Sequence, residues 1–177
     1  NYFTENMKLA DIITANYSLV LMLPRFNISL GFGEKSVKEI CERNGISVHF
    51  FLLICNVYTF DNYTPNNTKF EEMDFLVPYL SASHYYYMQE RLPHIEQHLN
   101  KIADRIDEKY GTILKRFFTN YKDEVAEHFS YEEKTVFPYL NKMEQGIINE
   151  KYIIKEFSAT HSNIEDKLGD LMSILIK

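Results

Sequence analysis

The chain has 177 residues, enough for one or two small domains with a real hydrophobic core. Its composition, 45% hydrophobic and 25% charged, is typical of a folded globular protein. The formal net charge of -6 argues against binding to nucleic acid through a basic surface. No apolar run reaches the roughly 18 residues that are needed to cross a bilayer. We therefore expect neither nucleic acid nor a membrane as a partner.

The first 58 residues predict a small N-terminal domain of about four short helices. A second helical stretch should stop or bend near Pro24, because proline removes a backbone hydrogen bond. Ser36 and Ser47 are placed to cap the next two helices, and Gly45 closes the first of these. Periodic alternation typical of β-strands is missing from this part of the sequence.

Two cysteines, Cys41 and Cys55, fall in different predicted helices. They form no CxxC motif and match no zinc-ligand spacing. We expect both to be reduced thiols in the core of a cytoplasmic protein.

Residues 59–72 are polar, with a Pro-Asn-Asn centre, and predict a linker. Long helical patterns joined by short turns fill residues 73–177. Helices connected in this way must pack antiparallel, so we expect an all-α, up-down helical bundle. Pro93 and Pro138 should kink or bend their helices, and Gly111 and Gly146 should end them. The predicted helices span about 75–109, 112–143 and 150–176.

Each long helix carries one histidine within its apolar stripe: His84, His128 and His161. One such histidine is usually an ordinary core residue. Three unpaired buried imidazoles, however, would cost several kcal/mol, at roughly 1–3 kcal/mol for each unsatisfied group. A shared metal ion removes this cost, because neutral imidazole is the commonest metal ligand.

Carboxylates one helical turn away strengthen this interpretation. Glu132 follows His128 by four residues, and Glu165 follows His161 by four residues, so each pair can reach one centre. Mixed imidazole and carboxylate ligands favour iron, manganese or zinc. Glu133 lies about 140° from His128 around the helix and should point to solvent. The remaining histidines are interpreted as ordinary polar or boundary residues: His49, His94 and His98.

Three segments, HYYYMQERLPHIEQHL, HFSYEEKTVFPYL and FSATHSNIEDKL, resemble successive helices of hemerythrin-like domains, and the second carries the motif HxxxEExxxFP. The whole chain resembles the iron-sulfur cluster repair family, also called repair-of-iron-centres or ScdA-like proteins. The resemblance implies a centre of two non-heme iron ions, and it carries over to His84, His128, Glu132 and His161. Glu165 is added on helical spacing.

The same resemblance implies small oxidants, nitric oxide and dioxygen, as ligands, and iron-sulfur proteins as partners in repair under nitrosative or oxidative stress. A sensor or carrier without turnover, and a structural bundle that has lost its metal, remain alternatives, so enzymatic activity is left open. The sequence departs from the family at Gly31 and Phe32, where adjacent cysteines are usual. It also lacks a second HxxxE pair after His161. We therefore expect that the natural protein continues past Lys177, or that a second chain completes the bundle in a homodimer, or that the site is degraded.

Overall fold

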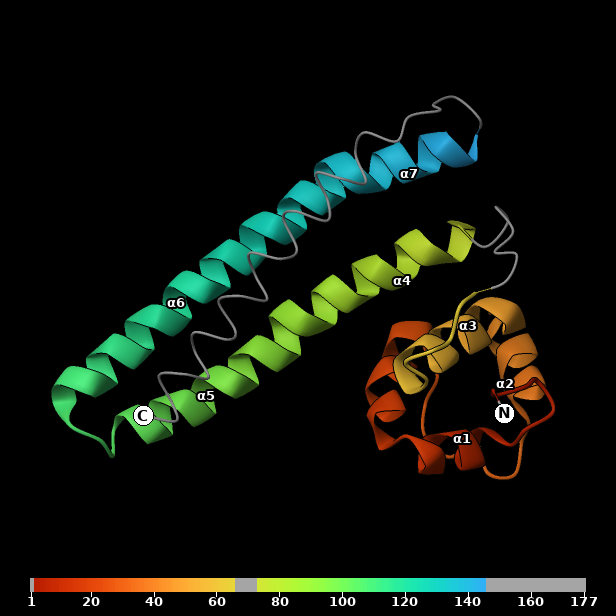
Figure 1. The fold of residues 1–177 in the computed structure, drawn as a ribbon, viewed down its shortest axis with the longest axis horizontal. Helices are drawn as coiled ribbons and strands as arrows, with labels where there is room; N and C mark the ends of the chain where they lie inside the picture. The colour runs from red at the N-terminus through yellow and green to blue at the C-terminus, as the bar shows by residue number, and fades with distance from the viewer. Residues whose placement is uncertain (1, 66–72, 146–177) are drawn as a thin grey trace. The chain divides into compact units, whose positions relative to one another are not determined.

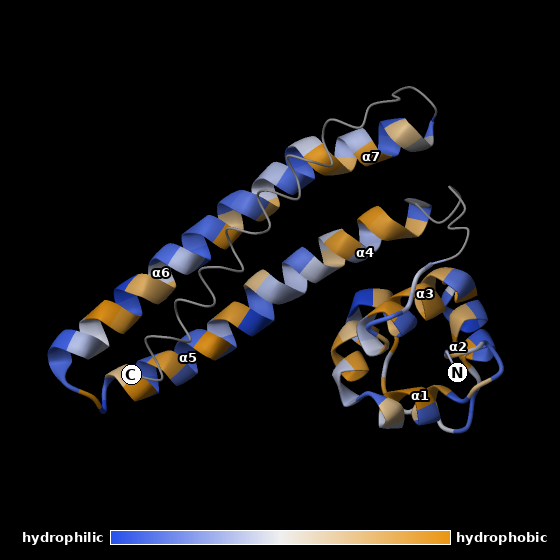
Figure 2. Cartoon of the chain, viewed as in Figure 1, coloured by the Kyte–Doolittle hydropathy of each residue, from blue (hydrophilic) through white to orange (hydrophobic). Residues whose placement is uncertain are grey.

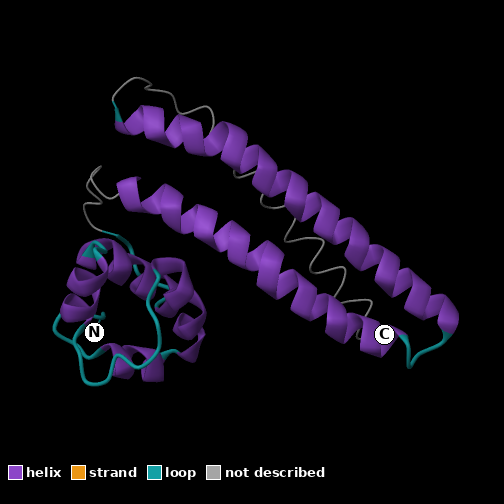
Figure 3. Ribbon diagram, turned by 180° about the vertical axis from the view of Figure 1, so that it is seen from behind, coloured by secondary structure: helices purple, strands orange, loops and turns teal. Residues whose placement is uncertain are grey.

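A computed structural model describes residues 2–65 and 73–145 of the chain. The chain divides into two compact units, Asn1–Ser83 and His84–Lys177. Within the described ranges the protein is helical and has no β-strand, apart from an isolated bridge between Lys8 and Ser36 (Figure 3). The prediction of an all-α protein is confirmed for these residues.

The first unit contains the expected short helices. Ser36 and Glu39 form a reciprocal capping box at the start of α2, and Ser47 accepts a hydrogen bond from the Phe50 N–H at the start of α3. Gly45 ends α2 in the left-handed conformation, with φ of 65°, as predicted. The helical elements of this unit are α1 (Leu9–Ala15), the 3₁₀ helix η1 (Tyr17–Phe26), α2 (Val37–Asn44) and α3 (Val48–Thr59).

The core of this unit also takes in the beginning of α4 (Met73–Tyr86). The ring of Tyr79 stacks on Phe26 with centroids 4.8 Å apart, and an Arg25 Nη1–H donates to the Tyr79 hydroxyl. Cys41 and Cys55 are buried free thiols, and burial raises the pKa of Cys41 to about 12. Burial also raises the pKa of Cys55, so both thiols are protonated at neutral pH.

The second unit is built on two antiparallel helical rods that lie side by side (Figure 1). Figure 2 shows apolar and polar residues alternating along both rods, as expected of amphipathic helices. Leu92 and Leu99 of one rod pack with Leu114 and Phe118 of the other. After the end of α4, the elements are the π-helix η3 (Tyr87–Arg91), α5 (Leu92–Ala103), α6 (Glu108–Tyr131), the π-helix η4 (Glu132–Val136) and α7 (Phe137–Glu144).

Both rods contain a π-turn directly before a proline. The Leu92 N–H bonds to the Tyr87 carbonyl, and the Phe137 N–H bonds to the Glu132 carbonyl, so each bond spans five residues instead of four. Pro93 and Pro138 follow at the next position. A proline ring clashes with the carbonyl four residues before it, and the wider turn gives that carbonyl room. The two expected irregularities are thus present, and the π-turn gives their form.

Gly111 lies inside α6, and the prediction that it ends the preceding helix is wrong. That helix ends at Ala103, and α6 begins at Glu108 with Asp107 as its cap. A Cβ at Gly111 would overlap the Ala103 carbonyl oxygen. Glycine is therefore present because the two helices approach closely here, rather than because the chain turns.

Helical periodicity also predicts that Ile102, Ile106 and Phe117 face the core, and two parts of this prediction need correction. Ile102, in the last turn of α5, and Ile106, in the turn after it, are exposed. On α6, Phe118 is buried, while Phe117 is half-buried. The helix predicted over 150–176 and the break at Gly146 lie outside the described residues. Among the helices within residues 2–65 and 73–145, none combines the length and the hydrophobicity of a membrane span.

We expect Gly111→Ala to lower the free energy of unfolding by about 1–3 kcal/mol, because the methyl group forces α5 and α6 apart. Urea denaturation measures this change. The control is Thr112→Ala at the adjacent exposed position, which should change stability little. An increase in stability for Gly111→Ala, as helix propensity alone would give, would show that the close approach is absent.

Candidate metal centre

The centre of the second unit is a carboxylate shared by two histidines. Glu132 Oε2 lies 2.8 Å from His84 Nε2, and Glu132 Oε1 lies 2.9 Å from His128 Nε2. All three side chains are at most 8% exposed. His84 comes from the end of α4, whereas His128 and Glu132 lie one turn apart where α6 meets the π-helix η4. The two rods therefore direct three polar groups to one buried point.

A second carboxylate holds the other edge of the His84 ring. Glu133 Oε1 lies 3.0 Å from His84 Nδ1, and its side chain is half-exposed. Glu133 is exposed, as expected, but it also contacts His84, which the sequence analysis did not predict. An imidazole has a nitrogen on each of two edges, so one ring can reach an inward and a flanking carboxylate together. The π-turn that begins at Glu132 also departs from the 100° per residue on which the expectation was based.

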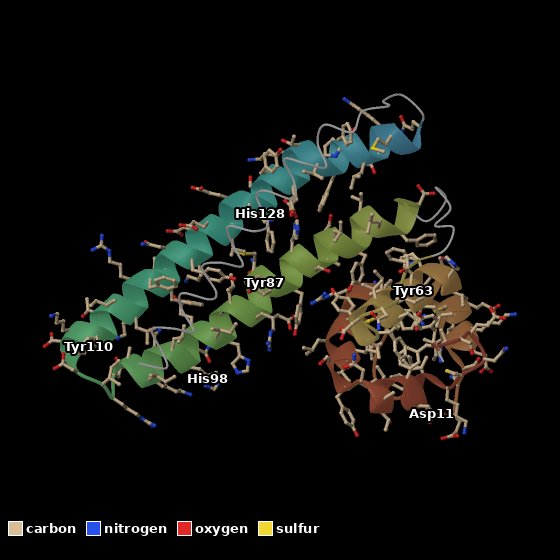
Figure 4. All side chains as sticks on the ribbon, viewed as in Figure 1. Asp11, Tyr63, Tyr87, His98, Tyr110 and His128 are labelled. Atoms are coloured by element: carbon tan, nitrogen blue, oxygen red, sulfur yellow. The ribbon has the colours of Figure 1, made fainter. Side chains whose placement is uncertain are left out.

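Aromatic rings enclose His84. The Phe129 ring stacks on it at a centroid distance of 3.9 Å and an interplanar angle of 8°. Phe137 stacks less closely, at 5.3 Å. Tyr87 meets Phe129 edge-on, and its hydroxyl lies 3.1 Å from the hydroxyl of Tyr121 (Figure 4 labels Tyr87 and His128). These rings shield the polar cluster from water, which strengthens the electrostatic interactions inside it.

The pKa of His84 reflects opposing effects. Burial acts to lower it, but the hydrogen bonds and negative charges of Glu132 and Glu133 outweigh burial and raise it above its ordinary value. The two carboxylates therefore favour the protonated, positively charged form of His84. Burial, aided by the hydrogen bond with Tyr87, also raises the pKa of Tyr121, which keeps that phenol neutral.

Three of the five predicted ligands thus lie together, because the Glu132 carboxylate is within 3 Å of a ring nitrogen of both His84 and His128. His161 and Glu165 lie outside the described residues, and their assignment stays a prediction. Within residues 2–65 and 73–145, no group of three His, Cys, Asp or Glu side chains is arranged to hold a metal ion. The donor types nevertheless suit a cation, since two imidazole nitrogens and a buried carboxylate meet at one point. His84, His128 and Glu132 would hold the metal, and Glu133 would orient His84.

Sequence reasoning missed the roles of Glu133 and Phe129. The repeated glutamate of HxxxEE was a usable signal for the first. Phe129 had no comparable signal, because its contact with His84 depends on how the two rods pack.

The family model of the hemerythrin HHE cation binding domain matches residues 71–177. The chain belongs to this family. The match covers the segment that contains both rods and all five predicted ligands. No curated protein and no solved structure matched the chain in two further comparisons.

We expect the pKa of His84 in the metal-free protein to fall on Glu133→Gln, because one of the two carboxylates that favour the imidazolium is removed. Since the folded-state pKa is raised, its contribution to stability is complete below the unfolded pKa of about 6.5 and is lost as pH rises through the folded value. The free energy of unfolding of the variant should therefore fall less than that of the wild type as the pH rises from about 6.5 through the folded-state pKa.

An NMR titration of the His84 ring, paired with urea denaturation at several pH values, measures both effects. Glu127→Gln, an exposed substitution on the same helix, is the matched control. Equal His84 titration curves in wild type and Glu133→Gln would contradict the assigned contact.

Proposed function

We propose that this protein binds iron in a hemerythrin-type centre of two ions, with His84, His128 and Glu132 as ligands and with His161 and Glu165 completing the set. The sharing of the Glu132 carboxylate between two imidazole Nε2 atoms carries this proposal. A carboxylate with one oxygen toward each histidine is suited to bridging two ions, as carboxylates do in di-iron bundle proteins. Manganese or zinc is an alternative occupant of the same donors.

Each residue around the centre has a definable task. Glu133 accepts a hydrogen bond from Nδ1–H of His84, which leaves the Nε2 lone pair available for a metal. Phe129 holds the plane of the His84 ring by stacking, and Phe137 covers it further. Bound iron would supply an open coordination position for a small ligand such as nitric oxide or dioxygen.

The biological role that we propose is repair of iron-sulfur clusters under nitrosative or oxidative stress, with small oxidants as ligands and iron-sulfur proteins as partners. It is supported by the resemblance of the whole chain to the iron-sulfur cluster repair family. The buried free thiols support a reducing, cytoplasmic setting. A sensor or carrier would use the same ligands without turnover, and a homodimer stays a prediction.

A structural role for the polar cluster is the second candidate. One observation favours it: the His84 ring contacts both Glu132 and Glu133, through Nε2 and Nδ1. Such a network can hold the two rods in register by itself. If this role is correct, ferrous iron should leave the melting temperature unchanged, because only a ligand that binds the native state raises it.

For the proposed site, we expect the purified chain to bind about two iron atoms. His128→Ala and Glu132→Ala should each abolish most of this binding, because they remove a ligand and the shared carboxylate. Metal analysis of anaerobically loaded protein measures the iron content. His49→Ala, at an exposed position on α3, is the control and should retain full iron content.

Unchanged iron content in His128→Ala and Glu132→Ala would show that the ligands are elsewhere. Circular dichroism must confirm that both variants fold. If either does not, Glu132→Gln keeps the size of the side chain and should still lose iron, because it removes the charge.

A further inference from the structure

A second pair of histidines lies outside the centre described above. His94 and His98 are four residues apart on α5, and both are exposed. Their Nε2 atoms are 3.1 Å apart, and their ring centroids are 4.9 Å apart (Figure 4 labels His98). His84 precedes His94 by ten residues, about 15 Å along a helix, so the two sites are separate.

We propose that His94 and His98 form a surface site for a divalent transition-metal ion of the Zn²⁺, Ni²⁺ and Cu²⁺ class. Residues four apart on a helix are neighbours on one face, and two histidines at this spacing form part of known helical zinc sites. Imidazole nitrogen is a preferred ligand for these ions, whereas Mg²⁺ and Ca²⁺ prefer oxygen.

The distance between the two nitrogens supports chelation. Two nitrogens, each about 2.0–2.1 Å from one ion at an angle between about 90° and 109°, lie roughly 2.8–3.4 Å apart. The observed 3.1 Å falls within this range. A direct hydrogen bond between two exposed rings contributes little by itself, because water can satisfy both nitrogens equally well.

The site has two protein ligands. The one acidic residue within α5, Glu96, is engaged elsewhere: its two carboxylate oxygens lie 2.7 and 2.8 Å from Lys122 Nζ on α6. The absence of any three-residue metal group from the described ranges agrees with this count. Water would complete the coordination, and the bound ion would fasten one turn of α5.

Isothermal titration of the untagged, metal-stripped full chain with Ni²⁺ tests the proposal. We expect one Ni²⁺ site per chain that is present in the wild type and lost in the His94→Ala, His98→Ala double variant. Each single substitution should weaken binding at this site at least about tenfold, because one of two ligands is removed. His49→Ala is the matched control, since it removes one exposed helical histidine from another helix. Ni²⁺ binding at the His94–His98 site should persist in His128→Ala. The result of this test therefore does not depend on the proposed iron centre.

An NMR measurement on the wild type checks the same point without a variant. Paramagnetic Ni²⁺ at one equivalent should broaden the ring signals of His94 and His98 together. Equal Ni²⁺ stoichiometry and affinity in the wild type and the double variant would overturn the proposal. The proposal would also be overturned if no Ni²⁺ site with a Kd below about 1 mM depended on the rings of His94 and His98.

Discussion

The second unit depends on one interaction, the sharing of the Glu132 carboxylate between His84 and His128. Moving a carboxylate and two imidazoles out of water costs several kcal/mol per ionised group unless each is hydrogen-bonded or paired. Here both carboxylate oxygens face a ring nitrogen, and Phe129 excludes water from one face of His84. The arrangement fixes the register of the two rods, because a shift of either rod would separate the histidines.

The π-turns and prolines are the backbone features that accompany this arrangement. Glu132 is the first residue of one π-turn, and it takes part in the turn through its carbonyl while its carboxylate joins the two histidines. The other π-turn begins three residues after His84. Because π-turns within α-helices often occur at functional sites, their position next to the proposed ligands agrees with a metal-binding role. Pro93 and Pro138 make an uninterrupted α-helix unfavourable in both places.

Much of this was accessible from the sequence. Local signals, such as Ser36 at a helix start, act through nearest neighbours and were interpreted correctly. The inward direction of His84, His128 and Glu132 followed from a constant 100° per residue, which holds as far as Glu132. It fails beyond that residue, and the contact of Glu133 with His84 was missed for that reason. Gly111 was misread as a helix end because its real constraint, the Ala103 carbonyl, comes from another helix.

The HHE family match indicates a cation-binding function, and the buried cluster is the basis for the ligands that we propose. His84, His128 and Glu132 on the two described rods are one part of the proposed ligand set. His161 and Glu165 are the other part. Two neighbouring carboxylates with different tasks explain why the motif contains a repeated glutamate: Glu132 faces both histidines, and Glu133 holds the far edge of one.

The most direct test is a crystal structure of the iron-loaded protein with anomalous diffraction measured at the iron absorption edge. The account predicts two anomalous peaks, each within coordination distance, roughly 2.0–2.3 Å, of the Nε2 atom of His84 or His128, with the Glu132 carboxylate in reach of both. A peak elsewhere, with Glu132 still bonded directly to both histidines, would contradict it.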